Sequence, residues 1–105
     1  DLERTLFVVA SKSGTTLETR CHLDFFWERA GKKGASFAAV TDPGSELDAL
    51  ALERGFGAVF HGEPTIGGRY SALSLFGMAP APLMGLDVER LLRDAQPMVR
   101  ALSTL

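Results

Sequence analysis

Apolar and polar residues follow one another along the chain in blocks that predict strands separated by helices. Residues 5–10 form a continuous apolar run, which is typical of a strand in a sheet covered on both faces. Three strands are predicted in all, over residues 5–10, 35–41 and 57–61. Helical spacing of apolar residues predicts four helices, over residues 15–32, 45–54, 71–76 and 87–103. Strands that alternate with helices predict right-handed crossovers and a parallel α/β sheet.

The first and last predicted helices each carry an apolar side that we expect to be buried. The first carries Leu17, Cys21 and Phe25 at steps of four, joined by Phe26, Trp27 and Ala30. This places the single cysteine on the apolar side, so we expect a buried thiol rather than a reactive one. The last carries one apolar face, made by Val88, Leu91, Leu92, Ala95, Val99 and Leu102.

Local signals mark where the two middle helices begin and end. Ser45 with Asp48 is expected to cap the second helix, and Gly55 is expected to close it. The short third helix is expected to begin at Ser71 and to end at Gly77.

Composition limits the classes of protein that the chain can belong to. With 105 residues, 46% of them hydrophobic, residues 1–105 are expected to form one domain. A net charge of −2 with scattered basic residues gives no expectation of a nucleic-acid partner. The short apolar runs and the single cysteine lead us to expect no membrane association and a cytoplasmic location. His22 and His61 show no ligand spacing with carboxylates, so no metal is expected.

A hydroxyl-rich segment, Ser11–Thr16, lies between the first predicted strand and the first predicted helix. Backbone N–H groups at a helix N-terminus lack intrahelical partners and can bind an anion. Gly14 would let the chain approach that anion, and the hydroxyls around it would donate further hydrogen bonds. The segment therefore predicts a phosphate site, at the sheet edge where residues 41–42 and 61–69 are also expected to gather. It matches neither the P-loop nor the dinucleotide-binding pattern, which argues against ATP and NAD.

A purely structural interpretation of the same segment is also open. Thr15 and Glu18 have capping-box spacing, so Thr15 could cap the helix while Glu18 bonds back to its N–H group. That interpretation needs no ligand, but it leaves the other polar residues of the segment without a role.

A second segment, Gly67–Ser74, contains two glycines followed by Arg69. Paired glycines permit a tight backbone approach to a ligand, and a guanidinium offers a fixed fork of donors for phosphate or a developing oxyanion. The alternative is a turn with a solvated Arg69, followed by a helix capped near Ser71. This motif alone does not decide between the two.

Taken together, Ser11–Thr19 and Gly67–Ser71 resemble the phosphoglucose isomerase family. The first is similar to the sugar-phosphate-binding signature of the wider sugar isomerase (SIS) superfamily. The second is similar to a signature of the glucose-6-phosphate isomerases within it. Ala39–Ser45 and Val88–Leu92 are most similar to the bacterial branch in which the isomerase is fused behind a transaldolase. The resemblance covers nearly the whole chain but only a fraction of the family's length, so we expect a fragment of a larger isomerase.

The resemblance implies a fold, an activity and a partner. The implied fold is a three-layer αβα domain of the SIS type, which is flavodoxin-like, with about three strands of its parallel sheet in this chain. The implied activity is the interconversion of glucose 6-phosphate and fructose 6-phosphate through an enediolate, in glycolysis and gluconeogenesis, without a cofactor. The implied partner is a small-molecule sugar phosphate. A homodimeric parent is compatible with the resemblance, although the sequence does not reveal the oligomeric state.

The resemblance also assigns residues to the site. It places the substrate phosphate on Ser11, Lys12, Ser13, Gly14, Thr15 and Thr16. Arg69 falls on an arginine near the reacting carbons, which implies stabilisation of the enediolate, and Gly68 lies beside the substrate. The family's glutamate base, with its histidine and lysine, has no match within residues 1–105, so the isolated chain is expected to be inactive.

Two functions of other classes stay open at this point. One is a non-catalytic, sugar-phosphate-sensing SIS domain of a regulator, and the other is an interaction domain that binds no phosphate. A sensor needs the phosphate loop but no charge stabiliser beside the reacting carbons, so Gly67–Ser71 favours the enzyme.

Overall fold

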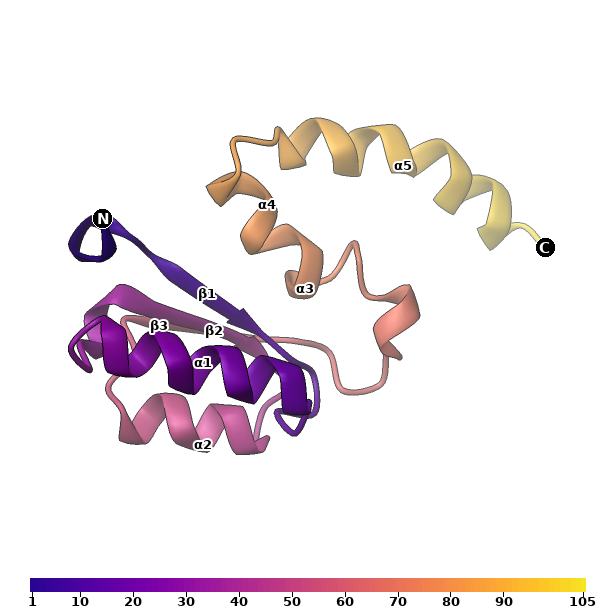
Figure 1. Ribbon diagram of the computed structural model, residues 1–105. Coiled ribbons are helices and arrows are strands. Elements are labelled where there is room, and N and C mark those ends of the chain that lie inside the picture. The colour runs from indigo at the N-terminus through magenta and orange to yellow at the C-terminus, as the bar shows by residue number, and fades with distance from the viewer.

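A three-stranded parallel sheet lies at the centre of the computed structural model, which describes all of residues 1–105 (Figure 1). Its strands are β1 (Phe7–Ala10), β2 (Phe37–Thr41) and β3 (Ala58–His61), in the order β1-β2-β3. Phe7 pairs with Phe37, and Ala38 pairs with Ala58. The predicted α/β class with a parallel sheet is confirmed, and each predicted strand is present with a slightly later start.

Helices lie on both faces of this sheet (Figure 1). The crossover helices α1 (Leu17–Arg29) and α2 (Glu46–Glu53) cover one face, as expected when successive right-handed crossovers add strands in one direction. The short helices α3 (Leu75–Met78) and α4 (Pro80–Leu83) lie on the other. Three single 3-10 turns complete this part of the chain: η1 (Leu2–Arg4), η2 (Gly34–Ser36) and η3 (Gly68–Tyr70). The arrangement is consistent with part of an SIS-type, three-layer domain.

The core lies between the sheet and the two crossover helices. Phe37 is at its centre, stacked on Phe7 at 4.7 Å between ring centroids and met edge-on by Trp27 at 5.3 Å. The fully buried members of this cluster are Val9, Leu23, Phe37, Ala39, Leu47 and Ala51. Strand β2 is buried along its whole length because it is the central strand and is covered on both faces.

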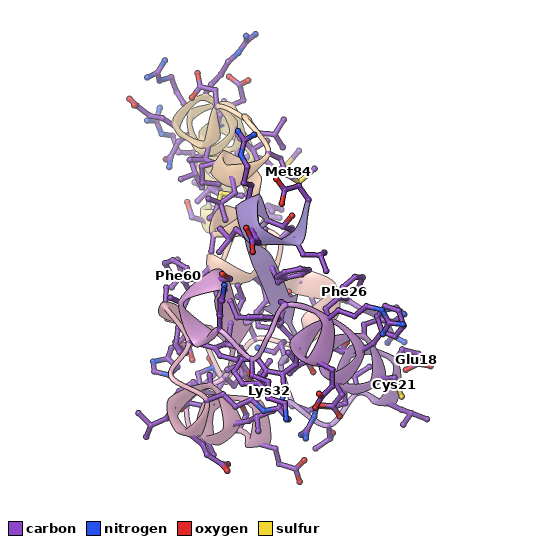
Figure 2. The ribbon with its side chains drawn as sticks, turned by 60° about the vertical axis from the view of Figure 1, so that its left-hand side comes forward. Glu18, Cys21, Phe26, Lys32, Phe60 and Met84 are labelled. Atoms are coloured by element: carbon purple, nitrogen blue, oxygen red, sulfur yellow. The ribbon has the colours of Figure 1, made fainter.

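The buried side of α1 differs from the predicted one. Leu23, only 2% exposed, is the buried residue of the helix, and Phe26, Trp27 and Ala30 pack against the core beside it. By contrast, Leu17 is 71% exposed, Phe25 is 48% exposed, and Cys21 is exposed on the outer side of α1 (Figure 2).

The prediction of a buried Cys21 thiol is therefore wrong, and its physical reason is helical geometry. A helix turns by about 100° per residue, so Leu23 shares a face with Trp27 and Ala30 that lies nearly opposite the stripe running through Leu17. Both sides of α1 carry apolar residues, and the side with the indole ring is the one that the sheet covers.

The cap of α2 is as predicted. The Ser45 hydroxyl accepts the N–H group of Asp48 at 3.1 Å, and Gly55 follows the helix with a φ of +65°.

The predicted helix over residues 71–76 is wrong. The Ser71 hydroxyl donates to the Gly68 carbonyl at 2.7 Å, which closes η3 instead of starting a helix. The Ser74 hydroxyl accepts the Phe76 N–H group at 3.2 Å, so Ser74 is the cap and α3 begins at Leu75. Gly77 lies inside α3, where an added Cβ would be only 2.0 Å from the Ala72 carbonyl oxygen.

Helix α5 (Val88–Ser103) has the predicted bounds and projects away from the sheet (Figure 1). None of its residues is buried, and the apolar face predicted for it is mostly exposed to solvent in this chain, with Val88 and Ala95 half-buried. No helix combines the length and the apolar content needed to cross a lipid bilayer.

Candidate functional site

The segment Ser11–Thr16 lies at the carboxyl edge of the sheet, where the loops after β2 and β3 also lie. Its start continues the parallel ladder, because the Ser11 N–H group donates to the Val40 carbonyl at 3.0 Å. The Lys12 carbonyl then accepts the Asp42 N–H group at 3.2 Å and the Thr41 hydroxyl at 3.3 Å. The loop is therefore fixed to β2 through its backbone, as expected for a site at this edge of an open α/β sheet.

Gly14 has a structural reason to be glycine. Its φ of +72° lies in the left-handed region, which residues with a side chain rarely adopt. A Cβ at this position would lie 2.4 Å from the backbone nitrogen of Leu47 and 3.2 Å from that of Glu46. The glycine thus allows the loop to rest against the first turn of α2.

The hydroxyls of the loop are linked to one another in a way that leaves hydrogens free. Ser13 Oγ accepts both the N–H group and the hydroxyl of Thr15, at 3.1 and 2.9 Å. A hydroxyl has two acceptor lone pairs and one hydrogen, so the hydrogen of exposed Ser13 is left to donate to another group. Ser11 Oγ accepts the Gly14 N–H group and lies 3.1 Å from Thr16 Oγ1. When buried Ser11 donates to Thr16, the hydrogen of exposed Thr16 is also free.

The N-terminus of α1 adds backbone donors. Its N-cap is Thr16, whose side chain makes no capping hydrogen bond, so the capping-box interpretation through Thr15 and Glu18 is wrong. The first backbone hydrogen bond into the helix is from the Arg20 N–H group to the Thr16 carbonyl at 3.1 Å. The N–H groups of residues 17–19 have no acceptor in the chain and carry the positive end of the helix dipole.

The ammonium of Lys12 is engaged by residues of the two neighbouring loops and by an aromatic ring. Its Nζ lies 2.9 Å from Asp42 Oδ1 and donates to the Glu63 carbonyl at 3.0 Å. It also lies 5.3 Å from the centroid of the Phe76 ring. The pKa of the Glu63 carboxyl is lowered, first by the N–H group of Thr65, then by the Thr65 hydroxyl, and further by the charge of Lys12. The sequence analysis placed Asp42 at this edge of the sheet but did not predict its ion pair with Lys12. The available signal was the position of Asp42 directly after a buried strand.

The second predicted segment lies against the first. Gly68 begins η3, and a Cβ added to it would be 3.8 Å from Lys12 Cδ, an ordinary contact distance. A Cβ on Gly67 would meet nothing within 4 Å. Unlike Gly14, these two glycines are not required by packing within the chain, which is the situation expected where a ligand approaches the backbone. Arg69 is exposed and forms no ion pair or hydrogen bond, so all its donors are available.

The two histidines lie outside this arrangement. His61 Nε2 is 2.9 Å from Asp48 Oδ1, and this contact is the largest cause of a lowered pKa of the Asp48 carboxyl, followed by the Gly44 N–H group. His22 lies on α1 and lines a mostly apolar hollow of about 460 Å³ beside β1. That hollow lacks clustered donors, so the candidate site is at the sheet edge instead. No three His, Cys, Asp or Glu side chains converge as a metal site would require.

Fold and geometry together define an α/β domain with a donor-rich loop at the carboxyl edge of a parallel sheet. Its sequence is similar to glucose-6-phosphate isomerases. It is 48% identical over 99 residues to that of Geobacter sp. (strain M21), which is 90% of this chain and 19% of the relative. It is 40% identical over 104 residues to that of Synechococcus sp. (strain JA-3-3Ab), which is 95% of this chain and 20% of the relative. No family model matches.

Solved structures agree with this similarity. A glucose-6-phosphate isomerase from Chlamydia trachomatis D/UW-3/Cx is 44% identical with a TM-score of 0.65, over 73% of this chain and 15% of that one. A hypothetical protein from Thermus thermophilus is 33% identical with a TM-score of 0.79, over 92% of this chain and 25% of that one. The resemblance to glucose-6-phosphate isomerases predicted from the sequence is confirmed. The chain spans about a fifth of the length of the curated relatives it matches.

Proposed function

We propose that this chain is the sugar-phosphate-binding segment of a glucose-6-phosphate isomerase, which interconverts glucose 6-phosphate and fructose 6-phosphate. One observation carries the proposal: unpartnered hydroxyl and backbone donors at the start of α1 lie in a loop that runs beside the segment bearing Arg69. Sequence identity of 40–48% to glucose-6-phosphate isomerases supports this proposal. Residues 1–105 are then part of one domain of the longer enzyme.

The substrate phosphate is proposed to bind at the start of α1. The direct donors are the hydroxyls of Ser13 and Thr16 and the first N–H groups of the helix, which suit an anion. The rest of the segment shapes the loop: Ser11, Lys12, Gly14 and Thr15. Binding energy from this non-reacting end of the sugar would hold C1 and C2 in place for the chemistry.

Arg69 is proposed to act at the reacting end. Isomerisation removes a proton from C2 of the open-chain aldose and returns one to C1, with an enediolate between the two steps. The exposed guanidinium has free donors beside Gly68 and can bind the negative charge as it develops on the enediolate oxygen. We assign the base to no residue of this chain, because the glutamate base of the family that it resembles has no match within residues 1–105.

The setting of the parent enzyme is part of the same proposal. We propose a cytoplasmic homodimer of the branch fused behind a transaldolase, in an SIS-type domain, acting in glycolysis and gluconeogenesis. The motifs at Ala39–Ser45 and Val88–Leu92 support the fused branch within this proposal. The mass of the native parent and its reading frame test it directly.

Calorimetry with the purified chain tests the proposed function. Glucose 6-phosphate is expected to bind and plain glucose is not, because the donors of the loop contact the phosphate. A coupled isomerase assay is expected to show no turnover by the 105-residue chain and turnover by the longer enzyme. Binding without turnover in the longer enzyme would instead support a sensing domain, and equal affinity for the two sugars would exclude both.

A further inference from the structure

The ammonium of Lys12 ties together the three loops that form the site. Lys12 follows β1, its carboxylate partner Asp42 follows β2, and its carbonyl partner Glu63 follows β3. The Lys12 and Asp42 side chains are only 19% and 21% exposed. Two of the three ammonium hydrogens are therefore used within the chain, and the ring face of Phe76 lies 5.3 Å from the nitrogen. The Lys12 ammonium therefore links the loops that follow β1, β2 and β3.

The stem of the same side chain lies near the segment that carries Arg69. The nearest atom to a Cβ built on Gly68 is Lys12 Cδ, at 3.8 Å. On the other side of the ion pair, a Cβ on Gly62 would lie 2.8 Å from Asp42 Oδ1 and 3.1 Å from the Phe76 ring. Backbone from the loop after β3 thus lies against Lys12 and its partner, and η3 begins near the lysine stem. Arg69 itself has no contact that would fix it.

We propose that Lys12 is a positioning residue, which sets the place of Arg69 relative to the phosphate loop and does not itself hold the phosphate. The proposal rests on the proposed function of the site. The ammonium fixes Asp42 and the Glu63 carbonyl, and Gly68 lies beside the methylene stem. Loss of the ammonium releases the loop after β3, and with it the segment Gly67–Tyr70.

The kinetic test uses the longer enzyme that contains this segment. Lys12→Met keeps an unbranched stem and removes the charge, and Asp42→Asn leaves Lys12 in place but removes its ionic partner. Each variant is expected to lower kcat by about 10- to 100-fold, the scale of a small misplacement of a catalytic group, with KM for glucose 6-phosphate nearly unchanged. The double variant is expected to be no worse than the poorer single one, because both remove the same contact. Lys12→Arg, which can pair with Asp42 again, is expected to recover part of kcat.

Opposite kinetics would overturn the proposal. If Lys12 grips the phosphate, Lys12→Met raises KM with kcat retained, and Asp42→Asn, which frees the ammonium, lowers KM or leaves it alone. Fully additive losses in the double variant would also contradict a shared contact. Lys33→Met, at an exposed lysine at the opposite end of the sheet, is the matched control and is expected to change neither constant.

A second measurement does not depend on isomerase activity. Amide hydrogen exchange over residues 67–70 of the longer enzyme is expected to quicken in both Lys12→Met and Asp42→Asn, and to stay as in the parent in Lys33→Met. Unchanged exchange in these two variants overturns the proposal even when the enzyme is active. If exchange quickens in these variants but the longer enzyme has no isomerase activity, the positioning role of Lys12 is supported and the proposed function is wrong.

Discussion

Gly14 and Leu47 approach so closely that the loop after β1 has room for no side chain at that point: a Cβ on Gly14 would lie 2.4 Å from the Leu47 nitrogen. Gly14→Ala therefore adds a backbone clash to an unfavourable φ of +72°. We expect it to lower the free energy of unfolding by roughly 2–5 kcal/mol, from about 1–2 for the left-handed conformation and about 1–3 for forced backbone shifts. Urea denaturation measures the loss.

Gly44 provides the matched control for this substitution. Its φ is +77°, but a Cβ there would meet nothing within 4 Å. Gly44→Ala is expected to cost only about 1–2 kcal/mol. Equal losses at the two positions would show that the contact with Leu47 adds nothing to the backbone conformation.

The free hydroxyls predict where phosphate binds. Replacing Ser13 and Thr16 together by alanine removes both outward donors, so we expect the binding of glucose 6-phosphate to weaken by roughly 2–4 kcal/mol, with water compensating part of the loss. Calorimetry on the wild-type and double-mutant chains provides the measurement, and circular dichroism checks that the fold is retained. Unchanged affinity would place the anion elsewhere.

Arg69 is expected to affect catalysis more than binding in the longer enzyme. The phosphate already has hydroxyl and backbone donors, whereas the free guanidinium of Arg69, beside Gly68, is the cationic group available for an enediolate oxygen. Arg69→Ala should lower kcat by about 10²–10³-fold, the scale seen when one oxyanion donor is lost. Steady-state kinetics separate the constants, and a normal kcat with a raised KM would falsify this role.

A leucine-to-alanine substitution is expected to affect stability very differently on the two sides of α1. Leu23→Ala leaves a cavity in the core and is expected to cost about 2–5 kcal/mol. Leu17→Ala, at an exposed position in the first turn, is expected to change stability by no more than about 0.5 kcal/mol. Thermal denaturation of the two variants compares them, and a larger effect at Leu17 would contradict the observed helix rotation.

The contact between His61 and Asp48 predicts a dependence on pH. The folded-state pKa of Asp48 lies below its ordinary value of 3.8, so its stabilising effect is fully present above that pH. It is lost as the pH falls through the lower folded-state value. In His61→Ala the Asp48 pKa is expected to rise toward 3.8 but not reach it, because the Gly44 N–H group still bonds to the carboxylate. Titration of the Asp48 carboxyl by NMR tests this, with His22→Ala as the control that should leave it unchanged.

Local signals in the sequence were sufficient for much of the fold. A continuous apolar run at β1 and the Ser45 cap of α2 each depend on neighbours in the chain, and both were predicted. The rotation of α1 was not predictable in the same way, because apolar residues occupy both of its sides and only packing on the sheet chooses between them. The start of α3 was missed because Ser71 and Ser74 are both acceptable caps, and the bond from Ser71 to Gly68 decides between them.

In the candidate site, too, local features could be predicted from the sequence and long-range contacts could not. The position and hydroxyl content of Ser11–Thr16 could be read from the sequence, since a strand, a polar loop and a helix follow one another directly. The engagement of Lys12 could not, because its partners Asp42 and Glu63 lie 30 and 51 residues away along the chain. Such contacts follow from the parallel register of the sheet, which no local pattern specifies.

The strand order β1-β2-β3 follows the order of synthesis. Each strand pairs with the one made just before it, and every contact that fixes the loop lies between Ser11 and Phe76. A chain leaving the ribosome can therefore close this edge of the sheet step by step, before the remainder of a longer enzyme is made. A phosphosugar in the cell would then act on the nascent chain as a folding ligand, because binding only the folded form stabilises it.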